Sequence, residues 1–233
     1  MVIGKQIELI KDILYIKKQI SRRGAIIQQY LAQESHPKLQ IGCGPYRMPG
    51  WLNTDISVKA CKAGAVYLNA AEAFPLPDNS FDYVYSEHLF EHLMHPHAVN
   101  MLKECHRILK DSGTIRIATP DFHFLVDLYL HPEKPENKRY IEWSANGGGE
   151  DLPIPATPLN VINKFHTSWG HQIIYNREVL SNLLEENGFG NVRVCEIGHS
   201  SKAELNNVES HFNSMPLEFY QLETMILEAD KVG

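Results

Sequence analysis

Short apolar segments alternate with helical patterns along most of this 233-residue chain, and this alternation constrains its fold more than any other feature. Strand-like segments separated by helices predict parallel strands joined by crossover connections. Helices then cover both faces of the sheet, because each connection returns across one face. The sequence therefore predicts an α/β fold with a mostly parallel sheet. The expected strands are residues 38–42, 51–56, 65–69, 81–86, 114–119, 192–197 and 224–229.

Apolar residues at helical spacing predict helices at 97–110 and at about 122–130. A further helix is expected between Asn176, whose side chain can cap its start, and Gly188, which can end it in a left-handed turn. Val179 and Leu180 should face the core in that helix.

One segment, residues 131–170, interrupts this alternation. It contains five prolines, a run of three glycines at 147–149 and little periodicity. A loop this long in a compact domain is usually functional or disordered. Because Trp143, Phe165 and Trp169 lie in it, we expect an ordered cover over a substrate.

Residues 1–35 are expected to form an amphipathic helix ahead of a single domain at 36–233. Ile3, Ile7 and Ile10 recur near helical spacing, and Gly24 is the place where the helix could break. Such a helix can lie on an anionic membrane, or pack against its own domain or a second subunit. Its interspersed acids and its lack of Trp and Phe favour packing or a homodimer.

Charge and composition exclude several classes of protein. The net charge of −6 argues against nucleic acid as the main partner, because phosphate contacts need a basic surface. Residues 1–35 contain six basic and three acidic residues, so they carry +3 and the remainder carries −9. No apolar run approaches the ~20 residues that span a bilayer, and no signal peptide is recognisable. The four cysteines lack the spacing of a zinc site or a disulfide framework, so we expect a cytoplasmic protein with reduced thiols.

Small or polar residues follow the expected strands, at the sheet edge where folds of this kind bind ligands. Gly42 and Gly44 permit a tight turn and a close backbone approach to a ligand. The dinucleotide fingerprint needs a third glycine where Arg47 stands, which disfavours a pyrophosphate cofactor. Asp55 ends the second strand, where it can accept both ribose hydroxyls or serve as a surface turn residue. The next two strands end in Asn69-Ala70 and Ser86-Glu87-His88.

Five motifs in order resemble class I S-adenosylmethionine (SAM)-dependent methyltransferases. They are Ile-Gly-Cys-Gly (41–44), Gly-Trp-Leu-Asn-Thr-Asp (50–55), Phe-Pro-Leu-Pro-Asp-Asn-Ser-Phe-Asp (74–82), Ser-Glu-His-Leu-Phe-Glu-His (86–92) and Arg-Ile-Leu-Lys-Asp-Ser-Gly (107–113). The resemblance covers roughly residues 38–198 and the final strand. The most similar branch is the compact bacterial methyltransferases associated with surface-polysaccharide biosynthesis.

The resemblance implies a Rossmann-like sheet of seven strands, the last of them antiparallel, and SAM as the cofactor. SAM carries no phosphate, in agreement with the incomplete dinucleotide fingerprint. Carried over by position, the cofactor-binding residues are Gly42, Cys43 and Gly44 at the methionine and ribose, Asp55 at the ribose hydroxyls, Asn69 and Ala70 at the adenine, and Ser86 at the methionine end.

The sequence departs from the family pattern at three places. Gln40 stands where the family usually has an acid before the glycines, which puts a contact to the amino group of SAM in doubt. Asn69 replaces an adenine-side Asp and keeps an acceptor without the charge. Only thirteen positions separate Gly42 from Asp55, so the first crossover helix must be shortened or missing, which opens that side of the pocket.

The expected reaction is methyl transfer to a small-molecule or glycan acceptor, most simply a hydroxyl. The enzyme must align the acceptor with the methyl group, and a hydroxyl must also lose its proton to a base. His88 is the first candidate because it follows the strand nearest the transferred group, although the backbone at a helix start could equally satisfy it. His166 and His171 flank Trp169 and are the other candidates.

Neighbouring residues have simpler interpretations. Glu91 and His92 are expected to pack and cap beneath the loop, and Asp121 is expected to cap the helix that follows it. His88, Glu91 and His92 also match the H-x-x-E-H pattern of inverted zinc proteases. That pattern is short and lies within a methyltransferase-like run, so we expect no metal. A SAM-binding scaffold without activity is a further alternative, kept open by Gln40 and Asn69.

Overall fold

The computed structural model describes residues 2–147 and 154–233, built around one seven-stranded sheet with strand order β3-β2-β1-β4-β5-β7-β6. The first five strands are parallel, and β7 is antiparallel to both of its neighbours. This topology confirms the fold predicted from the sequence, including the antiparallel last strand. The strands are β1 (Lys38–Ile41), β2 (Leu52–Asp55), β3 (Val66–Tyr67), β4 (Phe81–Glu87), β5 (Leu109–Pro120), β6 (Phe189–Cys195) and β7 (Thr224–Lys231).

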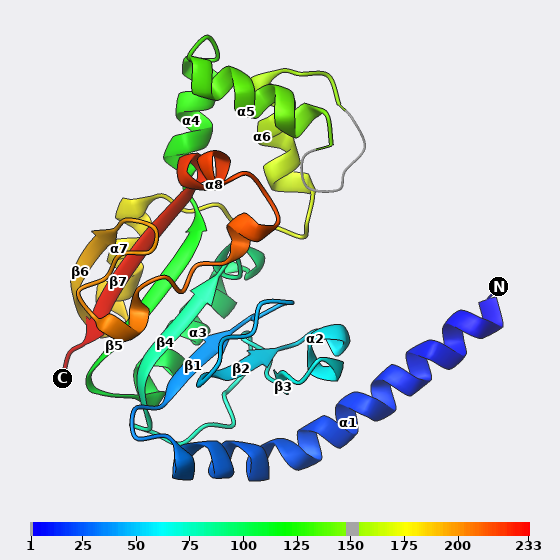
Figure 1. Ribbon diagram of the computed structural model, residues 1–233, viewed down its shortest axis with the longest axis vertical. Helices are drawn as coiled ribbons and strands as arrows, with labels where there is room; N and C mark the ends of the chain where they lie inside the picture. Colours follow the sequence, from blue (N-terminus) through cyan, green and yellow to red (C-terminus); the bar gives the residue numbers. More distant parts are fainter. Residues whose placement is uncertain (1, 148–153) are drawn as a thin grey trace.

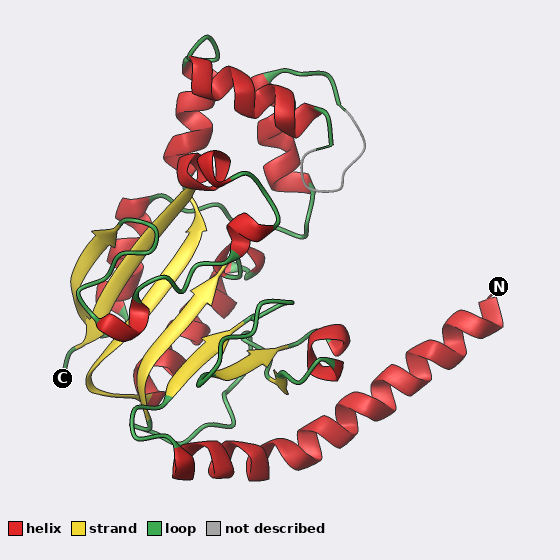
Figure 2. Ribbon diagram, in the orientation of Figure 1, coloured by secondary structure: helices red, strands yellow, loops and turns green. Residues whose placement is uncertain are grey.

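Helices flank the sheet and extend beyond the end at which β4 and β5 terminate (Figures 1 and 2). They are α1 (Val2–Gln33), α2 (Val58–Lys62), α3 (His95–Ile108), α4 (Phe122–Leu130), α5 (Pro135–Ala145), α6 (Pro158–Thr167), α7 (Arg177–Glu186) and α8 (Leu217–Glu223), with short 3-10 turns η1 (Phe90–His92), η2 (Ala203–Leu205) and η3 (His211–Asn213).

The main apolar core lies between one face of the sheet and helices α3 and α7. Val84 on β4, Leu102 on α3 and Leu180 on α7 are fully buried there. The segment between β6 and β7 covers the opposite face, where Leu205 packs near Tyr85. The alternation of side chains along each strand thus supplies two buried faces.

Two predicted boundaries shift because one strand is longer than expected. The helix predicted at 97–110 begins at His95 and ends at Ile108. Leu109 already pairs with Phe81, so β5 extends over Leu109–Pro120 rather than 114–119. Leu109 and Lys110, which the helical spacing had assigned to the helix, therefore belong to the strand that pairs with β4.

The predicted capping of α7 is confirmed. The Asn176 side chain accepts a hydrogen bond from the Val179 backbone at 2.9 Å, and Gly188 has a positive φ of 87° just beyond the helix. Leu180 is buried as expected, but Val179 is 46% exposed. Val179 lies in the first turn, on the side of the helix turned away from the sheet.

The prediction that residues 131–170 lack regular structure is wrong for the described part of that segment. α5 and α6 lie in it, and together with α4 and α8 they form a helical layer at the carboxyl end of the sheet (Figure 1). Phe124, Tyr140, Phe165 and Phe219 pack together in the centre of this layer. Part of the glycine run, Gly148 and Gly149, lies outside the described residues.

α1 is one continuous helix without a break at Gly24. Its second half packs on the domain: Ile27 is buried, and the Tyr30 hydroxyl donates to the Lys38 carbonyl at 2.9 Å. Its N-terminal end projects away from the body of the protein (Figure 1). Further along, Asp12 pairs with Lys62 at 2.8 Å and the Tyr15 hydroxyl donates to the Cys61 carbonyl at 3.0 Å. Within residues 2–147 and 154–233, no helix is long and apolar enough to cross a membrane.

The prediction of a shortened or missing first crossover helix is confirmed. Residues 42–51, all of which the structure describes, contain no helix between β1 and β2. Instead, Asn53 holds this loop by accepting from the Met48 backbone N–H at 2.8 Å and donating to the carbonyls of Met48 and Trp51.

Candidate active site

A cavity of about 500 Å³ lies at the carboxyl end of β1 and β4, beneath the helical layer. The turn after β1 forms one wall, and residues at the end of β4 and in η1 form another. The segment before β7 closes a third side with His211 and Glu223. Aromatic side chains from α5, α6 and the turn after α6 complete the cavity, namely Tyr140, Trp143, Phe165 and Trp169.

The glycine turn after β1 has the geometry that its sequence predicts. Gly42 and Gly44 have φ values of 71° and 51°, in the left-handed region that favours glycine. A Cβ atom at Gly42 would lie 3.1 Å from the Leu89 side chain. Gly42, Cys43 and Gly44 all line the cavity, so a ligand there meets the backbone directly.

Asp55 is fixed beside this turn rather than exposed on the surface. Its carboxylate accepts hydrogen bonds from the backbone N–H groups of Gly44 at 2.8 Å and Ser57 at 2.6 Å, and the residue is 8% exposed. Each carboxylate oxygen has a second lone pair with which it can accept from a ligand hydroxyl. The prediction that Asp55 holds a ribose is compatible with this placement.

From the sequence alone, it was in doubt whether Gln40 could contact the amino group of SAM. In the structure, its side-chain oxygen is placed as a hydrogen-bond acceptor. Its side-chain nitrogen donates to the Tyr46 carbonyl at 3.0 Å, and it lines the cavity although it is only 3% exposed. Its Oε1 is buried and has no hydrogen-bond partner among the described residues. A buried acceptor without a donor is costly, and the ammonium group of SAM would supply that donor.

Four of the predicted cofactor residues, Asp55, Asn69, Ala70 and Ser86, are not among the described residues that line the cavity. Asn69 closes its own turn by accepting from the Ala71 backbone at 3.0 Å and donating to Glu72 at 2.9 Å. Ala70 is buried. Ser86 is 1% exposed because its side chain points to the opposite face of β4 from Glu87, which lines the cavity.

The predicted histidines separate into two groups. His88 and His171 both line the cavity, whereas the His166 side chain is exposed on α6 and is outside the cavity lining that the structure describes. Phe165, the residue before His166, faces the cavity. Successive residues on a helix point in different directions, which explains why the two are separated.

His88 is held by contacts on each side of its ring. Its Nδ1 lies 3.3 Å from Glu91 Oε1, its Nε2 lies 3.2 Å from the Thr224 hydroxyl, and its ring stacks on His211 at 4.1 Å. Burial acts to lower the pKa of His88, but the contact with Glu91 outweighs it and raises the pKa. Burial acts to raise the pKa of Glu91, yet His88 and His92 lower it to about 2. Each group therefore stabilises the charged form of the other.

Sequence reasoning missed two titratable residues of the cavity, Glu223 and His211. Burial raises the pKa of Glu223 to about 7, against the opposing effects of His88 and of the hydrogen bond that the Tyr140 hydroxyl makes to its carboxylate. Burial lowers the pKa of His211 to about 4, and the charge of His88 acts in the same direction. Both lie more than 120 residues after His88, so no local motif could have indicated them.

The zinc-protease interpretation of H-x-x-E-H does not fit the observed backbone. That motif needs both histidines one turn apart on an α-helix. His88 instead has a positive φ of 45° and precedes η1, which spans only Phe90–His92. Glu91 is paired with His88 and also accepts from the Thr119 hydroxyl at 3.0 Å. The expected structural role of Asp121 is confirmed, since it caps α4 by accepting from the His123 backbone.

The parallel sheet, the glycine turn and the carboxylate beside it define a Rossmann-like ligand-binding protein. Residues 39–117 match the family described as "Methyltransferase domain". Two Mycobacterium tuberculosis proteins, from strains CDC 1551 and H37Rv, are each named "Probable S-adenosylmethionine-dependent methyltransferase" and are 30% identical to the chain over 134 residues. Each match covers 58% of this chain and 35% of the relative, so the chain spans about a third of the length of these relatives.

Solved structures of similar shape have low sequence identity to the chain. A SAM-dependent methyltransferase of Archaeoglobus fulgidus has a TM-score of 0.49 and 18% identity, covering 89% of this chain and 92% of that one. One from Mesorhizobium loti has a TM-score of 0.49 and 16% identity, covering 89% and 96%. Residues 39–117 therefore resemble a methyltransferase domain, and the relatives that match the chain are named as SAM-dependent enzymes.

Proposed function

We propose that the protein transfers a methyl group from SAM to a hydroxyl of a small-molecule or glycan acceptor. The observation that carries this proposal is the composition of the cavity. One side has a glycine turn, which the Asp55 carboxylate supports from outside the cavity lining through the Gly44 N–H, and the Gln40 oxygen, which has no partner among the described residues. These groups suit the ribose and ammonium groups of SAM. The other side is aromatic and titratable, which suits an acceptor that must be aligned and deprotonated.

The acceptor side supports a ring-bearing hydroxyl compound. Trp143 and Trp169 present flat apolar surfaces, and His211 and Glu223 supply groups that can hydrogen-bond to hydroxyls. A glycan in surface-polysaccharide synthesis is the finer form of the proposal. It is supported by the order of the five sequence motifs.

In this proposal Glu223 is the base. Its carboxyl group lines the cavity and has a pKa of about 7, near the value at which a general base works best. The acceptor oxygen attacks the methyl carbon, the carbon–sulfur bond breaks to give S-adenosylhomocysteine, and the hydroxyl proton passes to Glu223. Both ring nitrogens of His88 are engaged, with Glu91 and with Thr224, so we assign His88 to positioning beside the transferred methyl, and His171 to contact with the acceptor.

Titration of SAM and S-adenosylhomocysteine into Asp55→Ala tests the cofactor assignment. The variant should lose two charge-assisted hydrogen bonds to the ribose, worth about 2–4 kcal/mol, or a roughly 30- to 900-fold rise in Kd. Asp111→Asn is the matched control, because Asp111 is exposed near the start of β5. Equal affinity of Asp55→Ala and the wild type would show that the cofactor lies elsewhere. Release of S-adenosylhomocysteine in the presence of an acceptor would separate an enzyme from a SAM-binding scaffold.

We also propose that the exposed apolar face of the first half of α1 packs against a second copy of the chain. Ile10 and Leu14 are 56% and 59% exposed on this half. Residues 1–35 carry +3 and the remainder carries −9, so the helix of one copy complements the acidic body of another.

Ile10→Lys combined with Leu14→Lys should convert a dimer to a monomer, as measured by mass in solution. The two changes leave the buried Ile27 and the Tyr30 anchor in place, so the domain should stay folded. A wild-type protein that is monomeric but binds anionic vesicles would instead identify a membrane as the partner of this helix.

A further inference from the structure

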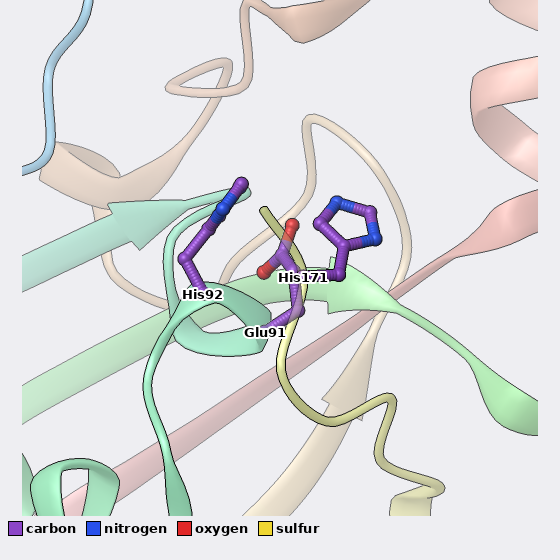
Figure 3. A group of neighbouring side chains, drawn as sticks. All are labelled: Glu91, His92 and His171. Carbon is purple, nitrogen blue, oxygen red and sulfur yellow. The ribbon is translucent and has the colours of Figure 1, made fainter. Parts of the chain in front are cut away.

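We propose that Glu91, His92 and His171 form a binding site for a divalent transition-metal ion at the wall of the cavity. One carboxylate oxygen and one ring nitrogen from each histidine lie within 4.8 Å of one another. Figure 3 shows the Glu91 carboxylate between the two imidazole rings. All three residues line the cavity, so an ion bound there would be accessible from it.

His171 is oriented as metal-binding histidines usually are. Its Nδ1 lies 2.8 Å from the Phe165 carbonyl oxygen. A carbonyl can only accept, so Nδ1 carries the hydrogen and Nε2 keeps its lone pair. Metal-binding histidines almost always donate their other N–H to a carbonyl or carboxylate, which fixes the ring and its tautomer.

Glu91 is a buried anion that its surroundings hold in place. Its side chain is fully buried, and the Thr119 hydroxyl donates to Oε2 at 3.0 Å. Oε1 lies 3.3 Å from His88 Nδ1 but has no aligned hydrogen bond among the described residues. A metal ion between Glu91 and the two other side chains would add to the stabilisation that His88 and Thr119 already give this buried carboxylate.

The two segments that supply the ligands are tied together by the backbone. The N–H groups of Gln172 and Ile173 both donate to the Glu91 carbonyl, at 2.7 and 3.2 Å. These bonds hold His171 opposite η1, which carries Glu91 and His92. The three side chains are therefore gathered before any ion binds, which lowers the conformational cost of binding.

Two imidazoles and one carboxylate are the ligand set of many catalytic zinc sites and of other sites with open coordination positions. Zinc ligands at about 2.0–2.1 Å in a tetrahedron stand about 3.3 Å apart, so the donors must approach by about 1.5 Å through side-chain rotation. The remaining position faces the cavity, where the acceptor hydroxyl could bind; this last step rests on the proposed function. His88 is not a ligand, so this site differs from the H-x-x-E-H interpretation.

The test is titration of untagged, chelator-treated protein with Zn²⁺ by calorimetry and with Co²⁺ by visible absorption. We expect one equivalent of each ion, reversed by chelator. His92→Gln and His171→Gln should each weaken binding at least tenfold. His166→Gln is the matched control, because His166 is exposed on α6, and it should bind as the wild type does.

Two results would overturn the site: no saturable binding by the wild type, or equal weakening by His166→Gln and His171→Gln, which would indicate scattered surface histidines. SAM titration of the same samples keeps the proposals separate. Intact SAM binding without metal binding would remove the metal site and leave the proposed function. Metal binding without SAM binding would remove the proposed function and leave the metal site.

Discussion

Glu223→Gln is expected to lower kcat for methyl transfer by about 10²–10⁴, the usual contribution of a positioned general base. Glutamine keeps the size of the side chain and can still pair with the Tyr140 hydroxyl, but it cannot accept the acceptor's proton. In the wild type, kcat/KM should rise with pH and level off above about pH 7, as Glu223 loses its proton. The variant should lack this rise.

Glu218→Gln is the matched control for that experiment. Glu218 lies on the same helix, α8, but its side chain is 52% exposed and is paired with Arg139. It should retain wild-type activity. If Glu223→Gln keeps both the wild-type rate and its pH dependence, then another group is the base. His88 and His171, which also line the cavity, would then be the candidates.

The same carboxyl group should affect stability. Its pKa is about 7 when folded and 4.5 as an ordinary glutamate, so the folded state holds the proton more tightly. Its contribution to stability is therefore complete below about pH 4.5 and is lost as the pH rises through 7. Glu223→Gln should remove that part of the pH dependence in urea unfolding.

Arg116→Met is expected to lower the free energy of unfolding by about 3–5 kcal/mol. Arg116 is fully buried on β5, and its guanidinium pairs with Glu209 and Glu228, each at 2.6 Å. Removing the guanidinium leaves two buried carboxylates without their shared cation. Arg193 still contacts Glu228 at 2.9 Å, but among the described residues the Glu209 carboxylate would keep only the Gly198 backbone N–H, at 2.8 Å.

Urea unfolding of Arg116→Met and of Arg139→Ala would test this expectation. Arg139 pairs with Glu218 at 2.9 Å, but both side chains are about half exposed, so that change should cost less than about 1 kcal/mol. Equal stabilities of the two variants would contradict the assignment. Arg116 also donates to the carbonyls of Glu196 and His199, so its loss should loosen the segment that carries His211.

Two helices that were not predicted, α5 and α6, are nevertheless marked in the local sequence. Pro135 and Pro158 are the first residues of α5 and α6. Proline is favoured at the first position of a helix, where its missing N–H and fixed φ cost nothing. Two of the five prolines in 131–170 therefore mark helix starts, although their number suggested an irregular segment. The buried pair Val161 and Phe165, four residues apart, carries the matching helical spacing.

The sequence alone determined the sheet, its antiparallel last strand, the glycine turn with Asp55 beside it, and the missing first crossover helix. These features depend on residues close together in the chain, or on motifs in a fixed order, because periodicity and positive φ values are local requirements. Only the tertiary structure decided which titratable groups meet. His88 and Thr224 are 136 residues apart, and Tyr140 and Glu223 are 83 apart. Their contacts arise because the strand ends converge under the helical layer, and burial there, rather than residue type, sets which of these groups holds a proton.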